Sequence, residues 1–225
     1  MKNILGHWLV PIALNFFVVL LFISGLLLKR DNIIDVSLFI YVLNIPFTII
    51  SSVIQLRKRK WYYLFPQIGF LSILFVILVF IFTFSPPDFY GVHKKIPEGI
   101  FISEPLTSKP PQELFNANHL IVSCIDQPGI YTYYTDYIPQ EDGYFYIKAF
   151  EINSNDELSK NDIMDKSKVF SEKMNSHIKE GTFTIYEGSW GDKYACRMEL
   201  WFHPLSKKTA FKIEERNYII EGWQR

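Results

Sequence analysis

The sequence predicts a helical membrane region followed by a C-terminal α+β domain. Three uncharged, mostly apolar runs occupy most of residues 1–84, and the later chain alternates apolar and polar residues in the manner of β-strands. The charge divides at the same place. Residues 1–84 carry seven Lys or Arg and two Asp, a net charge of +5, whereas residues 85–225 carry 16 Lys or Arg and 21 Asp or Glu, a net charge of −5. The second part is long enough to bury its own core.

The first run, residues 8–28, contains 21 uncharged residues. As a helix it would be about 31 Å long, enough to cross a hydrocarbon core of about 30 Å. The alternative is a cleaved signal peptide, but the apolar cores of signal peptides are only about 7–15 residues long. No small-residue cleavage site and no lipoprotein cysteine follows this run. We therefore expect residues 8–28 to be a retained membrane span.

The second run, residues 36–56, has the same length and contains Asn44 and Pro46 near its middle. Proline removes a backbone donor and usually kinks a helix, which membranes tolerate where neighbouring groups satisfy the freed carbonyl. We expect Asn44 to hydrogen-bond to another helix, with about 1 kcal/mol or less of stabilisation. Asn15 and Gln67 are further amides that can bond in this way.

The third run, residues 61–84, is 24 residues long and begins with Trp-Tyr-Tyr, an aromatic anchor typical of membrane interfaces. Four consecutive cations, residues 57–60, stand directly before it. Such a cluster indicates the cytoplasmic end of a span, so we expect a cytoplasmic N-terminus and an extracytoplasmic C-terminal domain. Lys29 and Arg30 favour the opposite orientation, but they are fewer and the cluster is denser.

The apolar runs also exclude some classes of membrane protein. None of the three contains Asp, Glu, Lys, Arg or His. Pumps, proton-coupled transporters and voltage sensors usually need such groups within the membrane, so we expect an anchor.

The chain is rich in Ile, Phe, Asn, Lys and Tyr, which favours an AT-rich bacterial genome and hence the bacterial cytoplasmic membrane.

Residues 85–117 predict an extended linker, because they hold six prolines in 33 positions. Ile100, Phe101 and Ile102 are apolar enough to dock on the following domain.

Residues 118–225 predict an antiparallel sheet of about six strands with one amphipathic helix against one face, in the order β-β-β-α-β-β-β. The three strands before the helix and the three after it are each expected to form a meander, in which consecutive strands pair. Ser154 and Glu157 fit a capping box at the start of that helix. The helix is expected to reach about Ile178, because apolar residues recur at intervals of seven and four. The expected strands are residues 119–125, 130–137, 144–152, 182–187, 193–203 and 209–223.

The two cysteines, Cys124 and Cys196, share strand parity with apolar neighbours and are expected to face the core. If the domain lies outside the cytoplasm, a disulfide between them is chemically permitted. It would close a loop of about 70 residues and stabilise the fold by a few kcal/mol. The alternative is two buried free thiols, which are common core residues.

Tyrosines crowd two neighbouring predicted strands and occupy both strand faces. One face must pack in the core, and the other is expected to leave tyrosines exposed as a protein-binding surface. The alternative is cross-strand aromatic pairing that only stabilises the sheet. The residues assigned to this surface are Tyr131, Tyr133, Tyr137, Tyr144 and Tyr146.

No motif for catalysis or cofactor binding stands out. The histidines form no His-x-x-x-His pair, the cysteines no Cys-x-x-Cys, and the chain has no Gly-rich phosphate loop and no Gly-x-Ser-x-Gly elbow. We therefore assign no catalytic, cofactor-binding or metal-binding residue. The acidic balance of residues 85–225 argues against a nucleic-acid partner.

These observations favour a non-enzymatic, multi-pass membrane protein whose extracytoplasmic domain binds another protein. One specific version is an immunity protein that protects a bacterium from a toxin acting at its envelope. Two alternatives stay open: an envelope enzyme, such as a hydrolase, with a site assembled from scattered residues, and a structural or sensory subunit of a membrane complex.

Overall fold

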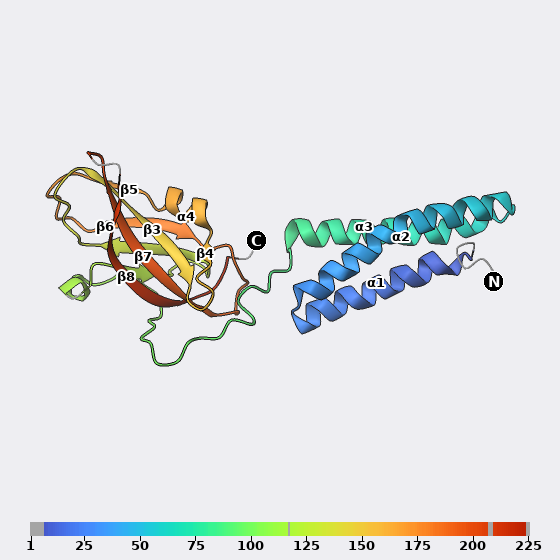
Figure 1. Ribbon diagram of the computed structural model, residues 1–225, viewed down its shortest axis with the longest axis horizontal. Coiled ribbons are helices and arrows are strands. Elements are labelled where there is room, and N and C mark those ends of the chain that lie inside the picture. Colours follow the sequence, from blue (N-terminus) through green and yellow to red (C-terminus); the bar gives the residue numbers. More distant parts are fainter. Residues whose placement is uncertain (1–6, 117, 207–208, 224–225) are drawn as a thin grey trace. The chain divides into compact units, whose positions relative to one another are not determined.

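The computed structural model of the protein describes residues 7–116, 118–206 and 209–223 (Figure 1). The chain divides into two compact units, of which the first ends at Pro87 and the second begins at Asp88. The first unit is helical and the second is built mainly of β-strands.

Three long helices form the first unit: α1 (Leu9–Leu28), α2 (Asp31–Arg57) and α3 (Leu64–Phe84). A short 3-10 helix, η2 (Trp61–Tyr63), precedes α3. All three helices are long and apolar enough to cross a membrane, so the three predicted runs are confirmed as helices. Helix α2 begins five residues before the predicted boundary of 36, because Asp31 carries a negative charge into its first turn, where the helix dipole favours it.

Polar side chains line the inside of this helical bundle. The buried positions of α2 repeat at intervals of three and four residues and include Ser37, Tyr41, Asn44, Thr48, Ser51 and Gln55. Apolar side chains of the same helix point outward instead; Phe39, for example, is 65 % exposed. A water-soluble helix would show the reverse pattern, so this arrangement suits surrounding lipid.

Amide side chains connect the three helices. The Nδ2 of Asn44 donates to Oδ1 of Asn15 over 2.9 Å, which confirms the expected interhelical bond of Asn44. The Nε2 of Gln67 donates to Oγ of Ser51 over 3.0 Å, and Ser52 donates to Oε1 of Gln67 over 3.0 Å. The polar positions of α2 therefore bond to both neighbouring helices, and Pro46 lies within the helix without ending it.

The second unit is a β-sandwich of two antiparallel sheets with eight strands in its described residues. The five-stranded sheet has the order β4-β3-β7-β8, and β5 also pairs with β3. The three-stranded sheet has the order β1-β2-β6. Two short helices, α4 (Lys160–Lys166) and η3 (Gln112–Asn116), lie outside the sheets. The strands are β1 (Ile121–Ser123), β2 (Ile130–Thr135), β3 (Gly143–Glu151), β4 (Glu157–Leu158), β5 (Val169–Ser171), β6 (Lys179–Thr184), β7 (Tyr194–Pro204) and β8 (Phe211–Ile220).

The core lies between the two sheets. Alternate residues of β3 and β7 point inward, among them Ile147 and its cross-strand partner Leu200. They meet Tyr133 of β2 and Phe183 of β6 from the three-stranded sheet, and all four side chains are at most 1 % exposed. The α+β prediction is thus right about the antiparallel strands and wrong about what covers them, because a second sheet rather than a helix provides most of the opposing core.

The predicted order of strand pairing is also wrong. Strand β3 does not continue a meander from β2 but crosses to the other sheet and pairs with β7. Strand β6 pairs with β2 instead of β7. Alternation of apolar residues identifies which face of a strand is buried but does not identify its partner, so the single six-stranded sheet could not be distinguished from two sheets.

The long amphipathic helix predicted over residues 154–178 is reduced to the seven residues of α4. Ser154 does not cap a helix; it lies in the turn after β3, where its hydroxyl donates to the carboxylate of Glu151. Phe170 and Met174 are 58 % and 60 % exposed, so the seven-and-four spacing does not mark a buried face. Local hydrogen bonds from Ser and Asn side chains compete with helix formation in this turn.

The Pro-rich segment expected as a linker belongs to the second unit from Asp88 onward. Ser103 accepts a hydrogen bond from the backbone N–H of Ile219 on β8 over 2.9 Å. Leu106 donates to the carbonyl of Val122 on β1 over 2.9 Å. The segment therefore closes one side of the sandwich by bonding to an edge of each sheet.

Candidate functional site

The outer face of the five-stranded sheet carries a continuous series of aromatic and charged side chains. Strand β3 contributes every second residue from position 144 to 150, and β7 every second residue from 197 to 203, because the intervening residues fill the core. We call this set the outer ladder. Its four cross-strand pairs are Tyr144 with His203, Tyr146 with Trp201, Lys148 with Glu199, and Phe150 with Arg197.

Aromatic stacking organises one end of the outer ladder. The rings of Tyr144 and His203 lie 5.0 Å apart at an interplanar angle of 16°. The rings of Tyr146 and Trp201 lie 6.4 Å apart at 22°. The ammonium group of Lys148 lies 4.6 Å from the centre of the Trp201 ring, which is a cation–π distance. These contacts hold large rings side by side on the surface of the sheet.

Paired charges organise the other end. Glu199 is only 6 % exposed and accepts a hydrogen bond from Nε1 of Trp201 over 2.9 Å. Its carboxylate also lies 3.3 Å from the side-chain nitrogens of Arg197 and Lys212. Arg197 stacks in turn on Phe150, with 5.0 Å between the guanidinium carbon and the ring centre. The buried charge of Glu199 is therefore compensated, and it fixes Trp201 and Arg197 in place.

Large rings and arginine on a firm, half-buried face are the residue types that contribute most of the binding energy at protein–protein interfaces. Trp201, His203 and Arg197 of the outer ladder were not assigned to a site from the sequence. The signal was present in the sequence, since residues 197, 201 and 203 alternate with the apolar residues of the predicted strand 193–203 and so share one strand face. What was missing was the pairing of β7 with β3.

The five predicted surface tyrosines separate into different places. Tyr144 and Tyr146 belong to the outer ladder, although Tyr144 is half-buried and Tyr146 is only 6 % exposed. Tyr131 and Tyr133 are 2 % and 0 % exposed, so their assignment to a surface is wrong. Tyr137 is half-buried between His119 and Phe145 rather than on the ladder.

The inward tyrosines are tolerated in the core because their hydroxyls find partners. Tyr133 donates to the carbonyl of Ser167 over 2.9 Å, and Tyr131 donates to the carbonyl of Glu221 over 2.9 Å. Burial raises the pKa of both tyrosines, so both remain neutral hydrogen-bond donors.

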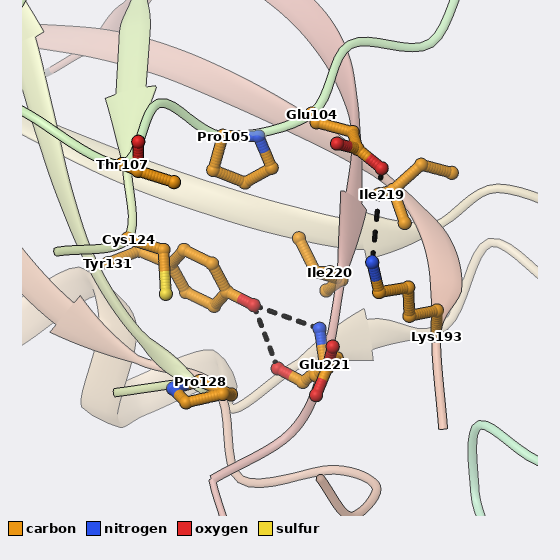
Figure 2. A pocket seen from close by; sticks show the side chains of 10 residues that line it. All are labelled: Glu104, Pro105, Thr107, Cys124, Pro128, Tyr131, Lys193, Ile219, Ile220 and Glu221. Carbon is orange, nitrogen blue, oxygen red and sulfur yellow. Dashed lines mark hydrogen bonds and ion pairs between the residues drawn. The ribbon is translucent and has the colours of Figure 1, made fainter. Parts of the chain in front are cut away.

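A pocket of about 220 Å³ opens beside Tyr131, near the edge that the Pro-rich segment closes (Figure 2). The hydroxyl of Tyr131 points at the backbone of Glu221, and Cys124 lines the same wall (Figure 2). Lys193 and Glu104 form an ion pair of 3.8 Å across the pocket. Lys193 and Glu104 are thus paired with each other, and the carboxylate of Glu221 accepts a hydrogen bond from the backbone N–H of Gly191 over 2.7 Å. The thiol of Cys124 is the lining group whose chemistry is closest to that of a nucleophile.

Both cysteines are free thiols in this structure, so the disulfide between Cys124 and Cys196 is not formed. Cys196 points into the core from β7 and is 0 % exposed, and burial raises its pKa. Cys124 follows β1, and burial together with the nearby carboxylates of Glu221 and Asp126 raises its pKa. A protonated thiol is a weak nucleophile, which argues against a catalytic role for either cysteine.

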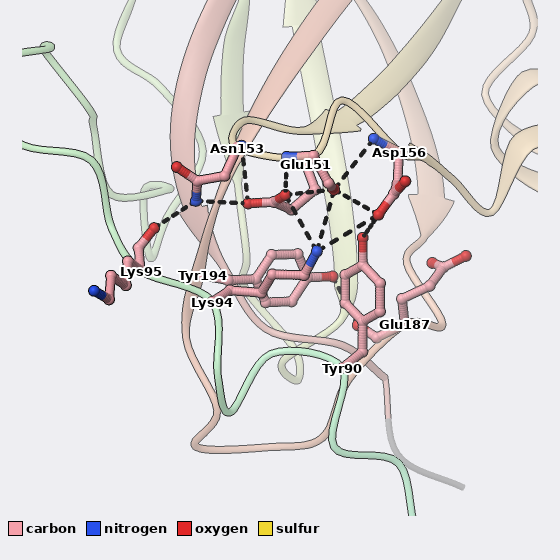
Figure 3. A network of polar contacts seen from close by, with 9 residues as sticks. Tyr90, Lys94, Lys95, Glu151, Asn153, Asp156, Glu187 and Tyr194 are labelled. Atoms are coloured by element: carbon pink, nitrogen blue, oxygen red, sulfur yellow. Dashed lines mark hydrogen bonds and ion pairs between the residues drawn. The ribbon is translucent and has the colours of Figure 1, made fainter. Parts of the chain in front are cut away.

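A network of polar contacts joins the turn after β3 to the segment around Lys94 (Figure 3). Glu151 is 0 % exposed, and its carboxylate accepts hydrogen bonds from the backbone N–H groups of Asn153 and Ser154 over 3.1 and 2.6 Å. The ammonium of Lys94 lies 3.3 Å from Glu151 and 3.5 Å from Asp156. Tyr90 donates to Asp156 over 3.0 Å and lies beneath Lys94.

This network lowers the pKa of Glu151. Burial alone would raise it, but the hydrogen bonds from Ser154 and Asn153 and the charge of Lys94 outweigh burial and bring the pKa to about 2. Every oxygen of the carboxylate is occupied by a partner from the turn or from Lys94. The arrangement fixes a turn and fastens the segment that leads into the sandwich, and it leaves no carboxylate oxygen directed at a substrate.

No protein family matches the sequence, and no curated protein is significantly similar to it. Within residues 7–116, 118–206 and 209–223, no three His, Cys, Asp or Glu side chains lie close enough together to hold a metal ion.

Proposed function

We propose that the chain is a three-span protein of the bacterial cytoplasmic membrane that holds its β-sandwich outside the cytoplasm and binds another protein there. The apolar outer surface of the helices supports insertion in a membrane. The four cations of residues 57–60 support a cytoplasmic α2–α3 turn, and a third span then carries the sandwich to the far side.

The outer ladder is the observation that carries the binding role. Its rings are held by stacking and its buried charge is neutralised, so these side chains are already ordered. They therefore lose little conformational entropy when a partner covers the face. At protein–protein interfaces, a minority of residues each weaken binding by about 2 kcal/mol or more when truncated to alanine, and Tyr, Trp and Arg are enriched among them. In its most specific form, the partner is a toxin that acts at the envelope and the chain is the matching immunity protein.

Replacing Trp201 with alanine is expected to weaken partner binding by roughly 30-fold or more, because truncation of a central aromatic typically costs about 2 kcal/mol. A photoreactive aromatic amino acid at position 144 of the outer ladder, where Tyr144 stacks on His203, leaves Trp201 in place and should first capture the partner when the full-length chain is expressed in cells. The purified partner is then titrated against wild-type chain and the Trp201→Ala variant.

Trp190 supplies the matched control, because it is 47 % exposed and lies outside the outer ladder. Trp190→Ala should leave the affinity within about twofold of wild type. If Trp201→Ala and Trp190→Ala weaken binding equally, or if the partner crosslinks from position 190 and not from position 144, the outer ladder is not the binding surface.

A further inference from the structure

A lipid-facing groove lies where α2 ends and α3 begins. It has a volume of about 510 Å³. Its walls are almost wholly apolar, and Trp61 and Phe65 are 59 % and 67 % exposed. The residues that line it are Leu56, Trp61, Leu64, Phe65, Ile68 and Gly69.

Four cations stand in the turn that joins the same two helices. Arg57, Lys58, Arg59 and Lys60 are all exposed, and none of them forms an ion pair with a described residue. The turn itself is fixed by backbone bonds, since the N–H of Lys60 donates to the carbonyl of Gln55 over 2.9 Å. The acidic residues of α2, Asp31 and Asp35, lie at its opposite end, so they cannot neutralise the turn.

We propose that this turn and groove form a binding site for one anionic phospholipid. The phosphate of the headgroup is held by the cations of residues 57–60, and an acyl chain lies in the groove along Leu64 and Ile68. Charge complementarity favours an anionic lipid over a zwitterionic one, because basic clusters beside spans attract negative headgroups. The inference rests on the proposed insertion of the three helices in a membrane.

Gly69 allows the groove to be filled selectively. No atom lies within 4 Å of a Cβ added at this position, so a side chain can start here without a clash at its first carbon. Leucine is also a better helix former than glycine, so Gly69→Leu should fold normally. Gly69→Ala is the matched control, because it makes the same backbone change but leaves most of the groove open.

Native mass spectrometry of the full-length chain in detergent, with phosphatidylglycerol or phosphatidylcholine added, measures the site directly. The wild type is expected to retain phosphatidylglycerol at least about tenfold more strongly than phosphatidylcholine. Gly69→Leu should retain less phosphatidylglycerol than the wild type, because it fills the acyl-chain groove, and the double variant R59Q/K60Q should lose the preference for the anionic lipid. Gly69→Ala and the double variant K29Q/R30Q, which removes two cations from the α1–α2 turn, should keep both the retention and the preference. Inorganic phosphate should not displace the lipid.

Equal retention of the two lipids by the wild type, unchanged retention by Gly69→Leu, or displacement by inorganic phosphate alone would each overturn the lipid site. Carbonate extraction of cell membranes separates this failure from failure of the proposed function. A chain that resists extraction but shows no lipid preference contradicts the site alone, whereas a chain released by carbonate contradicts the membrane insertion on which the site rests.

Discussion

Replacing Glu151 with alanine will lower the free energy of unfolding of the β-sandwich by about 3–5 kcal/mol, the usual cost of removing one partner from a buried ion pair. The carboxylate is 0 % exposed and accepts bonds from Asn153 and Ser154 as well as the charge of Lys94. Its loss leaves these donors without their acceptor. Thermal unfolding of the full-length chain in detergent, followed by tryptophan fluorescence, should show a midpoint lower by roughly 6 °C or more.

Glu180 is the control for this variant, because its ion pair with Lys109 is exposed to solvent and Glu180→Ala should leave the midpoint nearly unchanged.

The effect of Glu151→Ala should also depend on pH. The pKa of Glu151 falls from 4.5 to about 2 in the folded protein. Its stabilisation is therefore fully present above the unfolded pKa and is lost as the pH falls through the folded pKa. A difference between wild type and Glu151→Ala that stays constant from pH 6 down to about pH 2 would contradict this account.

Replacing Gly129 with alanine should cost about 3 kcal/mol, through a backbone conformation that alanine disfavours together with overpacking. Gly129 has a φ of +88°, and a Cβ added there would lie 2.3 Å from the backbone nitrogen of Trp223. That nitrogen donates to the carbonyl of Ile185 over 2.7 Å. The C-terminal segment must therefore move away from its partner, and the thermal midpoint should fall by roughly 6 °C or more.

Gly191 is the control that separates the steric contact with Trp223 from the cost of the left-handed backbone conformation. It has a similar φ of +84°, but no atom lies within 4 Å of an added Cβ. Gly191→Ala should therefore show only the conformational cost, about 1–2 kcal/mol. If the two variants unfold at the same temperature, the close approach of Trp223 to Gly129 does not contribute to stability.

The helical unit was predictable because each span is one uninterrupted apolar run, and a helix satisfies its own backbone groups without a distant partner. The polar inside of the bundle was partly visible too, since Asn44 in a long apolar run must find a hydrogen-bond partner in another helix. The β-sandwich was harder to predict from the sequence. Strand pairing depends on contacts far apart in the sequence, such as that between Tyr146 and Trp201, and alternation alone does not specify them.

The candidate site shows the same limit. Tyr144 and Tyr146 were assigned to a surface together with Tyr131 and Tyr133, because tyrosine composition does not distinguish an exposed ring from a buried one with a bonded hydroxyl. The buried hydroxyl of Tyr133 needs the carbonyl of Ser167 as its acceptor. Ser167 directly follows α4, but the predicted helix over residues 154–178 had placed it inside a helix. The capping-box pattern at Ser154 gave a wrong helix start for a related reason. The Ser154 hydroxyl bonds to the buried, charged carboxylate of Glu151, which is a stronger hydrogen bond than one to a backbone group at a helix end.

The side of the membrane on which the C-terminus lies decides whether the β-sandwich is an extracytoplasmic domain. Alkaline phosphatase and a fluorescent protein are fused separately to residue 225 and expressed in a bacterium, because phosphatase is active only outside the cytoplasm and the fluorescent protein is bright only inside. We expect phosphatase activity without fluorescence. Fluorescence without phosphatase activity would place the β-sandwich and its outer ladder in the cytoplasm and contradict the proposal of an extracytoplasmic binding domain.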